Sequence, residues 1–365
     1  MSSAEPGGQT ADRYRRAPGL VIYWAGPQAV CFVWQSSQRI PISIQVVAIL
    51  QELSDWTSAA ELRDRYVQGG EVTAVEETID LLLTLQLVER EGDAQNTGWP
   101  EWAPEAAFFH FATKNGVFPQ DLKTRDRELV EKSKTHPQPA PTKTIDGPRL
   151  SLPRTTLASA DLEAALTTRR TWRRFADAPV PAAALGTTLD YTFGVQRRGS
   201  VPNQGPVILR TAPSGGSRHP IEAYVLAWNV DGLRPGAYHY DSDRKELVDL
   251  QRPIAAGDIG PMLAHQTYFA RAGAAVIMCP VFARTRWRYG HSRAYRTVLI
   301  DAGHLGQTFC LVATALGLAP FTTMAFSESA LETLLGLDGI DECPLYVAGV
   351  GVRDPDGTDA PGRWE

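Results

Sequence analysis

The stretch TAPSGGSRHPIEAYVL, residues 211–226, places a polar, glycine-containing loop directly before an apolar strand. Pro213 fixes one turn, and Gly215 and Gly216 permit positive φ and a close approach of the backbone to a flat ligand. Ser214 lies within the loop, and His219, at its end, is the best histidine candidate for a substrate contact. Taken alone, such a loop is equally typical of an ordinary connection between strands. Its meaning depends on the sequence around it.

Helix and strand signals alternate on both sides of this loop, which predicts a single α/β domain over residues 153–365. The predicted helices cover residues 158–166, 182–193, 295–316 and 327–335, and the predicted strands cover residues 222–228, 246–250, 274–281 and 345–352.

A second segment, RRTWRRF at residues 169–175, holds four arginines within six residues. Like charges are costly to crowd together unless an anion neutralises them. Arg169, Thr171 and Arg173 alternate, so in an extended segment they point the same way and present two guanidinium groups and a hydroxyl to one phosphate. A solvated basic loop with surface ion pairs is the alternative interpretation.

Two further segments offer groups to a ligand. Residues 317–324, GLAPFTTM, follow the long predicted helix and offer exposed backbone N–H groups. Residues 349–353, GVGVR, form a strand that ends in Arg353.

In this order, the segments resemble the nitroreductase-like flavoproteins, and more closely the SagB-type dehydrogenases that oxidise azolines in ribosomal peptide natural products. The resemblance implies an α+β, nitroreductase-like FMN-binding fold and a homodimer with the flavin at its interface. No GxGxxG motif follows a strand, which agrees with FMN rather than a dinucleotide. Besides the two segments quoted above, the resemblance rests on PGAYHYD (235–241), RYGHSRAYRTVLIDAGHLGQTFCLVATALGL (288–318) and LYVAGVGVR (345–353).

The resemblance also implies roles for individual residues. Backbone near Thr322 and Thr323 would face the flavin N5 edge, where a donor stabilises the reduced anion. The isoalloxazine ring would be lined by Pro213, Ser214, Gly215 and Gly216. The phosphate would be held by Arg169, Arg170, Thr171 and Arg173, with Arg353 closing the far side.

One departure from the family concerns the reaction itself. Azoline oxidases of this type carry a Lys-Tyr pair before the RAYR segment, and the equivalent pair here is Arg288-Tyr289. Arginine is effectively always charged, so Arg288 is expected to orient or stabilise a carbanion while Tyr289 exchanges the proton. A surface ion pair beside a packed aromatic ring is the alternative. Thr308 also replaces the family's Asn, so the resemblance supports flavin binding more firmly than azoline oxidation.

Residues 1–98 predict a small winged-helix-like domain, with two strand-like runs (20–24 and 29–34), three helices and a short closing strand. Ser58 and Glu61 have the spacing of a capping box at the second helix. The third helix is acidic on its polar face, which disfavours DNA. The pattern resembles the PqqD-like fold, which binds a leader peptide as a strand added to a sheet edge. An extension that only supports the dimer is the alternative.

Residues 99–152 separate the two domains. They are rich in Pro, Lys and Asp, and the run KTHPQPAPTKTIDGP (134–148) predicts an extended, solvated linker.

Composition sets the broad class. The 365 residues suggest two domains, and the net charge of −5 gives no reason to expect nucleic acid. We expect no signal peptide, no membrane span and a cytoplasmic location. The cysteines are scattered, which argues against a disulfide framework or zinc site; they are Cys31, Cys279, Cys310 and Cys343.

Three functions compete. The leading hypothesis is an FMN-dependent dehydrogenase that modifies a precursor peptide, alone or with partner maturation enzymes. The second is a nitro- or enone-reductase that uses NAD(P)H on small molecules. The third is a flavin-free peptide-binding scaffold, against which the retained arginines argue.

Overall fold

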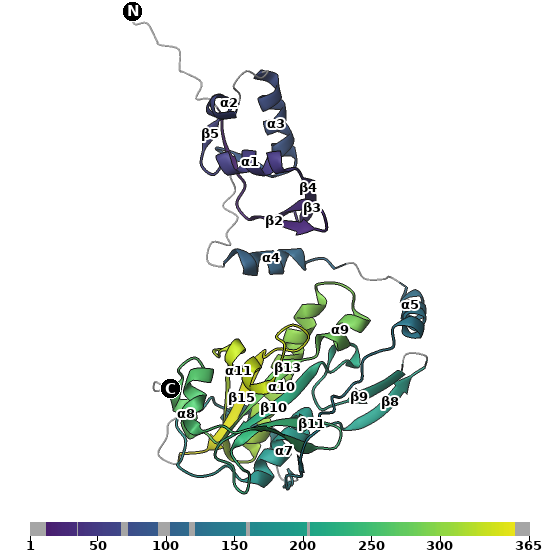
Figure 1. Ribbon diagram of the computed structural model, residues 1–365, viewed down its shortest axis with the longest axis vertical. Coiled ribbons are helices and arrows are strands. Elements are labelled where there is room, and N and C mark those ends of the chain that lie inside the picture. Colours follow the sequence, from purple (N-terminus) through teal and green to yellow (C-terminus); the bar gives the residue numbers. More distant parts are fainter. Residues whose placement is uncertain are drawn as a thin grey trace, which may run out of the picture. The chain divides into compact units, whose positions relative to one another are not determined.

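The chain folds into two compact units, unit 1 (1–117) and unit 2 (118–365), shown in Figure 1. The computed structural model describes residues 12–34, 36–66, 72–93, 103–116, 121–157, 161–202 and 205–354.

Unit 1 contains a three-stranded antiparallel sheet in the order β2-β3-β4, followed by three helices. Side chains of β3 alternate between two faces: Cys31 and Val33 join a core with the helices, whereas Phe32 faces the other way. The two predicted strands and three predicted helices are therefore confirmed. The elements are β2 (Leu20–Ala25), β3 (Gln28–Val33), β4 (Gln38–Ile42), α1 (Ile44–Glu52), α2 (Ala59–Tyr66) and α3 (Val72–Thr84).

A second small sheet completes the winged-helix-like arrangement. Strand β1 (Arg13–Arg16) lies between β5 (Thr57–Ser58) and β6 (Val88–Arg90), antiparallel to both. The predicted capping box is present, because the Glu61 N–H donates to Ser58 Oγ at 3.2 Å and the Ser58 N–H donates to Glu61 Oε2 at 2.8 Å. The closing strand at β6 also agrees with the prediction.

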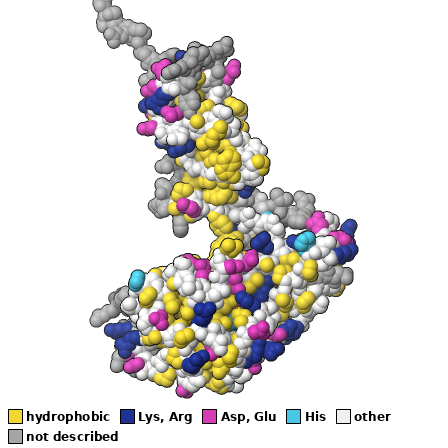
Figure 2. All heavy atoms as spheres, viewed as in Figure 1, with side chains coloured by type: hydrophobic (Ala, Val, Ile, Leu, Met, Phe, Trp, Pro, Cys, Tyr) yellow, Lys and Arg dark blue, Asp and Glu magenta, His cyan; other side chains and the backbone are white. Residues whose placement is uncertain are grey.

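Helix α4 (Pro104–Ala112) covers the second face of the β2-β3-β4 sheet. The ring of Phe108 lies 5.4 Å from that of Phe32 and 5.7 Å from that of Tyr23. This helix belongs to the segment predicted as a linker, so unit 1 extends beyond residue 98. Trp24 remains 69% exposed, and Figure 2 shows apolar side chains gathered on the visible face of unit 1.

Unit 2 is built on a seven-stranded sheet in the order β14-β15-β13-β10-β11-β12-β7, in which all neighbouring strands are antiparallel. This arrangement, with helices packed on its faces, confirms the predicted α+β class. The strands are β7 (Arg149–Leu150), β10 (Ile221–Ala227), β11 (Gly236–Asp241), β12 (Glu246–Arg252), β13 (Ala274–Pro280), β14 (Leu318–Thr323) and β15 (Tyr346–Val352); a separate hairpin pairs β8 (Arg197–Val201) with β9 (Gly205–Leu209).

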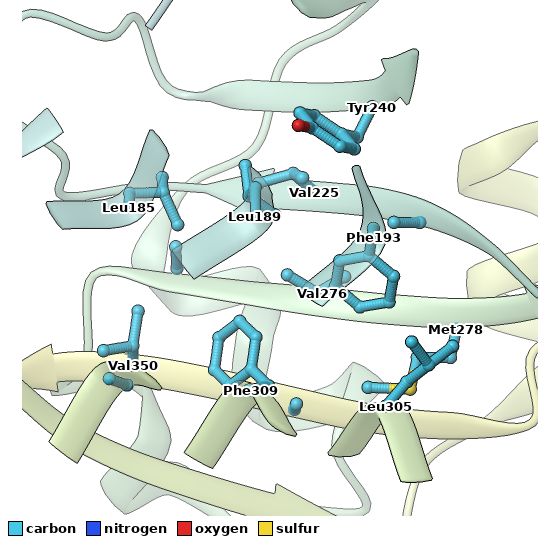
Figure 3. Close-up of a cluster of buried hydrophobic side chains, with 14 of the residues drawn as sticks. Leu185, Leu189, Phe193, Val225, Tyr240, Val276, Met278, Leu305, Phe309 and Val350 are labelled. Carbon is cyan, nitrogen blue, oxygen red and sulfur yellow. The ribbon is translucent and has the colours of Figure 1, made fainter. Parts of the chain in front are cut away.

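One face of the sheet is covered by α7 (Ala182–Phe193) and α10 (Ala294–Ala315), which lie against each other. Figure 3 shows Phe193 and Phe309 from these helices packed against Val276 of the sheet. The other face has its own core, in which the rings of Phe269 and Phe321 stack at 3.8 Å. It is covered in part by α8 (Ala256–Met262) and α11 (Glu328–Leu335).

Helix α10 is the long helix predicted from residues 295–316. In the described part of the chain, it alone is long and apolar enough to cross a membrane by length and composition. Half of that stretch is buried inside unit 2, as expected for the central helix of an α/β domain.

The predicted linker does not stay solvated between residues 136 and 150. Backbone carbonyls of His136 and Ala140 accept hydrogen bonds from Trp287 Nε1 (2.7 Å) and Arg284 Nε (2.8 Å), and β7 joins the sheet. Lys143 Nζ donates to Tyr224 Oη at 2.7 Å. Polar groups buried on unit 2 need partners, and this connector supplies them. Helix α5 (Leu122–Thr135) precedes it.

Candidate functional site

The glycine loop of residues 213–219 is fixed to helix α10 by one carboxylate. Ser214 Oγ donates to Asp301 Oδ2 at 2.5 Å, and the Gly215 N–H donates to Oδ1 of the same residue at 3.3 Å. Ser214 Oγ also accepts from the His219 N–H at 2.8 Å, which closes the loop on itself. A Cβ at Gly215 would lie 2.2 Å from Thr297 Cγ2, so only glycine allows this approach to α10.

The loop also meets the Arg288-Tyr289 pair. Helix α9 (Phe282–Arg288) ends at this pair, and Gly216 has a φ of +61°. A Cβ at Gly216 would lie 2.4 Å from Arg288 Cδ and 2.7 Å from Tyr289 Oη. The structure therefore brings together two groups that the sequence separates by more than seventy residues. The side chains of Arg288 and Tyr289 leave no room for a Cβ at position 216, so this position requires glycine.

His219 lies buried at the end of the glycine loop. The residue is only 6% exposed and has a positive φ of 43°. Burial and the charges of Arg210, Arg218 and Arg284 lower its pKa to about 3, against the opposing effect of a hydrogen bond to the Ile208 backbone. His219 is therefore a neutral, buried imidazole at the end of the loop, and its role in substrate contact stays a prediction.

A buried ionic network under the loop escaped the sequence analysis. Glu222 is 1% exposed and lies 2.6 Å from Arg284 NH1 and 2.9 Å from His239 Nε2. Arg284 also donates to the His219 carbonyl at 3.2 Å, and Arg210 donates to the Ile221 carbonyl at 2.9 Å. Glu222, a charged residue in the otherwise apolar strand β10, was the sequence feature that could have indicated this network, because a fully buried Glu is rare unless it is paired.

The arginine segment runs beside the edge strand β14. The Trp172 N–H donates to the Pro320 carbonyl at 2.9 Å, and Phe175 bridges to Arg353 at the end of β15. Arg169 lies near Cys310 of α10, where it opposes the effect of burial, which raises the pKa of that thiol to about 11. Arg170 donates to the carbonyls of Thr167 and Arg169, whereas Thr171 is half-buried.

No carboxylate in the described part of the chain forms an ion pair with the four arginines of residues 169–174. This observation weighs against the alternative of a basic loop with surface ion pairs. Arg173 is exposed, so its guanidinium remains open to an anion from solvent.

Arg353 has a role in the fold as well. Its Nε donates to the Leu318 carbonyl at 3.0 Å and its NH2 to the Thr314 carbonyl at 3.1 Å, and its guanidinium lies over the Trp172 ring at 5.6 Å. One of these bonds reaches the first residue of β14 and the other reaches the last turn of α10, so Arg353 ties the strand to the helix. Two of its donors are therefore used by the backbone before any ligand binds.

Thr322 and Thr323 end β14, so the segment predicted to offer exposed N–H groups is an edge strand paired with β15. Both threonines are half-buried, and Thr323 Oγ1 accepts from Gln266 Nε2 at 3.1 Å. They line a cavity of about 470 Å³ together with Leu299, Ala302 and Gly303 of α10.

Helix α10 thus organises all of these groups. The glycine loop and the two threonines lie along residues 299–304, where His304 Nδ1 also approaches the Pro213 carbonyl at 3.4 Å. Arg169 lies near Cys310, and Arg353 donates to the Thr314 carbonyl. At ~1.5 Å per residue, the ten residues from 304 to 314 span about 15 Å, which suits an elongated ligand with a ring at one end and a phosphate at the other.

Residues 166–352 match the model of the nitroreductase family, which is slightly more than half of the chain. The chain belongs to the nitroreductase family. Nitroreductases are oxidoreductases that typically bind flavin, so membership assigns this broad class to unit 2.

Three relatives match this chain over different shares of its length and of their own. MJ1384 of Methanocaldococcus jannaschii is 30% identical over 191 residues, which cover 52% of this chain and 90% of that protein. The trifolitoxin-processing protein TfxB of Rhizobium leguminosarum bv. trifolii is 33% identical over 39% of each chain. The microcin B17-processing protein McbC of Escherichia coli is 29% identical over 40% of this chain and 56% of its own length. The chain thus spans only about two fifths to three fifths of the two processing proteins.

The residues present fit the flavin of a nitroreductase. The arginines of residues 169–174, which form no ion pair with a described carboxylate, suit a phosphate, and the glycine loop and Thr322-Thr323 both lie beside α10. The candidates for lining the ring thus lie beside the middle of α10, and Arg169 and Arg353 lie near its C-terminal part.

Proposed function

We propose that this nitroreductase is an FMN-dependent dehydrogenase that acts on a ribosomally made precursor peptide. The observation that carries the proposal is the contact of Gly216 with Arg288 and Tyr289, because it joins the loop that would line the flavin to the pair that would handle the proton. The names of TfxB and McbC, which are processing proteins for trifolitoxin and microcin B17, support a role in peptide maturation.

When bound, FMN would supply the hydride acceptor or donor at N5. Arg169, Arg170, Thr171 and Arg173 would hold its phosphate. Tyr289 would take or give the proton at the reacting atom, and Arg288, which stays charged, would stabilise negative charge there without acting as a base. Oxidation of the peptide requires oxygen or another electron acceptor, and reduction requires a nicotinamide donor.

A homodimer forms part of the proposal. Helix α10 exposes apolar side chains at Tyr295 (41%), Leu299 (36%) and Ile300 (56%), beside residues that would line the flavin. Burying such side chains against a second copy would stabilise a dimer and exclude water from the site.

Unit 1 would hold the leader part of the peptide. Its sheet ends in two edge strands, β2 and β4, and among the described residues each of them pairs with β3 alone. An extended peptide can add to such an edge through backbone hydrogen bonds. The proposed setting is the cytoplasm, with partner maturation enzymes acting on the same peptide.

The test uses the purified full chain and candidate precursor peptides from its gene neighbourhood. We expect a yellow protein whose released flavin is FMN, and a change in peptide mass that corresponds to two hydrogen atoms. Tyr289→Phe should lower kcat by about 100-fold or more while flavin content stays constant, because a positioned acid or base contributes at least this much. Tyr191→Phe, on the exposed side of α7, is the matched control.

A colourless protein would refute the flavin enzyme. Turnover of nitro compounds with no change in the peptide would favour the small-molecule reductase.

A further inference from the structure

A strained turn lies behind the segment that would face the flavin. Helix α8 ends at Met262, and two residues soon after it, Ala264 and His265, have positive φ angles of 49° and 60°. The His265 N–H donates to the Gly260 carbonyl at 2.7 Å, which closes the end of the helix. Glycine normally occupies such left-handed positions, because a side chain costs free energy there. Backbone strain of this kind collects at functional sites, so the residue that the turn positions, Gln266, calls for an explanation.

The side-chain amide of Gln266 connects this turn to the end of β14. Its Nε2 donates to the Leu263 carbonyl at 3.0 Å, to Thr323 Oγ1 at 3.1 Å and to the Ala325 carbonyl at 2.9 Å. Its Oε1 accepts from Tyr268 Oη at 2.8 Å. Backbone carbonyls cannot donate, so the nitrogen end of the side chain must face them. Both ends of the amide are therefore bonded, and the side chain has one orientation.

This connection fixes the chain on both sides of Met324, whose side chain is 68% exposed. Thr323 Oγ1 accepts from Gln266 and also from the Ala325 N–H at 3.0 Å. Gln266 thus bonds the first and the last residue of the short turn that follows β14. The position of this exposed turn at the edge of the sheet depends on one side chain from the segment after α8.

The group that this support would position is the N–H of Thr322. In an antiparallel edge strand, the N–H and C=O groups of alternate residues point away from the sheet. The Pro320 carbonyl is one of these groups, because it accepts from the Trp172 N–H outside the sheet. The Thr322 N–H, two residues further on, points the same way, beside the cavity that Thr322 and Thr323 line with α10.

We infer that Gln266 is a positioning residue for the flavin, which holds the end of β14 so that the Thr322 N–H donates to N5 of oxidised FMN. Gln266 is not among the residues that line the cavity, so it acts through the backbone of β14 and not by contact with the ring. The strain at Ala264 and His265 keeps the amide in reach of Thr323 and Ala325. This inference rests on the proposed function, to which it adds a residue outside the motifs of the sequence.

Two matched flavins test the inference on the full-length, flavin-free protein without any turnover. FMN accepts a hydrogen bond at N5, whereas 5-deaza-FMN has a C–H group there and keeps the phosphate and the ring shape. We expect the parent protein to bind FMN roughly three- to tenfold more tightly than 5-deaza-FMN in fluorescence titrations, as one neutral hydrogen bond would produce. Gln266→Leu should reduce this preference to about one and change the affinity for 5-deaza-FMN by less than about twofold, because only the bond at N5 is lost.

A matched control and a second pair of variants separate positioning from general support. Gln196 Nε2 also donates to backbone carbonyls, those of Asp190 and Gly194, but at the end of α7. Gln196→Leu should therefore keep the flavin preference of the parent protein. Thr323→Val removes the acceptor that Gln266 bonds and should lower the preference, whereas Thr323→Ser keeps the hydroxyl and should retain it.

The two affinities together decide the outcome. If Gln266→Leu weakens the binding of both flavins equally, its role is purely structural and the inference is overturned. A parent protein with no preference, or an unchanged preference in Gln266→Leu, would also overturn the inference and leave FMN binding in place. A protein that binds neither flavin would refute the proposed function, and this inference with it.

Discussion

Unit 2 contains two groups of arginines that differ in what surrounds them. Arg210, Arg218 and Arg284 are at most 7% exposed, and each donates to a backbone carbonyl in or near the glycine loop. The arginines of residues 169–174 are exposed or half-buried, and no carboxylate in the described residues forms an ion pair with them. The buried arginines therefore belong to the fold, whereas the second group lacks acidic partners among the described residues, as the proposed phosphate site requires.

The buried group also links distant parts of the chain. Arg218 donates to the Gly216 carbonyl at 2.9 Å and to Gln138 Oε1 at 2.6 Å, and Arg284 donates to the Ala140 carbonyl. The connector that follows unit 1 thereby holds both the glycine loop and α9. Removing a buried arginine or its carboxylate partner should therefore lower the stability of the protein. Removing the arginines of residues 169–174 should instead weaken ligand binding and leave stability unchanged.

The largest effect is expected from Glu222→Gln, which leaves Arg284 buried without its counter-charge. Breaking a buried pair in this way costs about 3–5 kcal/mol of the free energy of unfolding. The melting temperature of the flavin-free protein should fall by roughly 10 °C in calorimetry. Glu222→Gln combined with Arg284→Met removes both charges and should recover much of the loss. An unchanged melting temperature for the single variant would show that this pair does not support the fold.

The same carboxylate makes stability depend on pH. Burial raises the pKa of Glu222, but Arg284, His239 and Arg210 outweigh burial and lower it to about 2, from an ordinary value of 4.5. A folded-state pKa below the unfolded value gives stability that is full above pH 4.5 and is lost as the pH falls toward 2. The difference in melting temperature between the parent protein and Glu222→Gln should therefore shrink below pH 4.5. A constant difference across this range would contradict the assignment.

An intermediate effect, on binding alone, is expected from Arg169→Ala combined with Arg173→Ala. Each hydrogen bond to a charged phosphate contributes about 1.5–3 kcal/mol, so FMN affinity should fall by about 100-fold or more. Stability of the flavin-free protein should stay the same or rise, because like charges are removed. Fluorescence titration with FMN measures the affinity. Arg197→Ala combined with Arg252→Ala removes two exposed arginines elsewhere and should change neither quantity. Unchanged FMN affinity in the Arg169/Arg173 variant would contradict the proposal that these arginines bind the phosphate.

The sequence predicted the parts of the fold that depend on local pattern. Helices α7 and α10 and strands β10, β13 and β15 follow from apolar periodicity within each segment. Strands β11 and β14 were missed because their stability is tertiary. In β11, His239 is buried by pairing with Glu222, and β14 tolerates Pro320 because it is an edge strand.

For the candidate site, the order of the motifs predicted the glycine loop and the arginine segment. The network beneath the loop could not be predicted, since Glu222 and Arg284 are far apart in sequence and charged residues are ordinarily exposed. Lys143 and Glu342, which form an ion pair, are farther apart still. The roles of His219 and Arg353 depended on burial and backbone partners that only the packed structure reveals.

The smallest effect is expected from Asp301→Asn. This substitution tests whether the charge of the carboxylate that holds the glycine loop is needed for stability, as the charge of Glu222 is. Burial raises the pKa of Asp301 above its ordinary 3.8, against the opposing hydrogen bonds from Ser214 and Gly215. A raised folded-state pKa favours the protonated form on folding, so stability declines as the pH rises through 3.8 and levels off above the folded-state pKa. Asn keeps one acceptor and removes the charge, so the free energy of unfolding should change by less than about 1 kcal/mol near neutral pH. Urea unfolding from pH 3 to 8, with Asp177→Asn at an exposed position as control, should show that the decline disappears in the variant alone. A loss of several kcal/mol at neutral pH would instead place Asp301 with Glu222, as a charge that the folded loop requires.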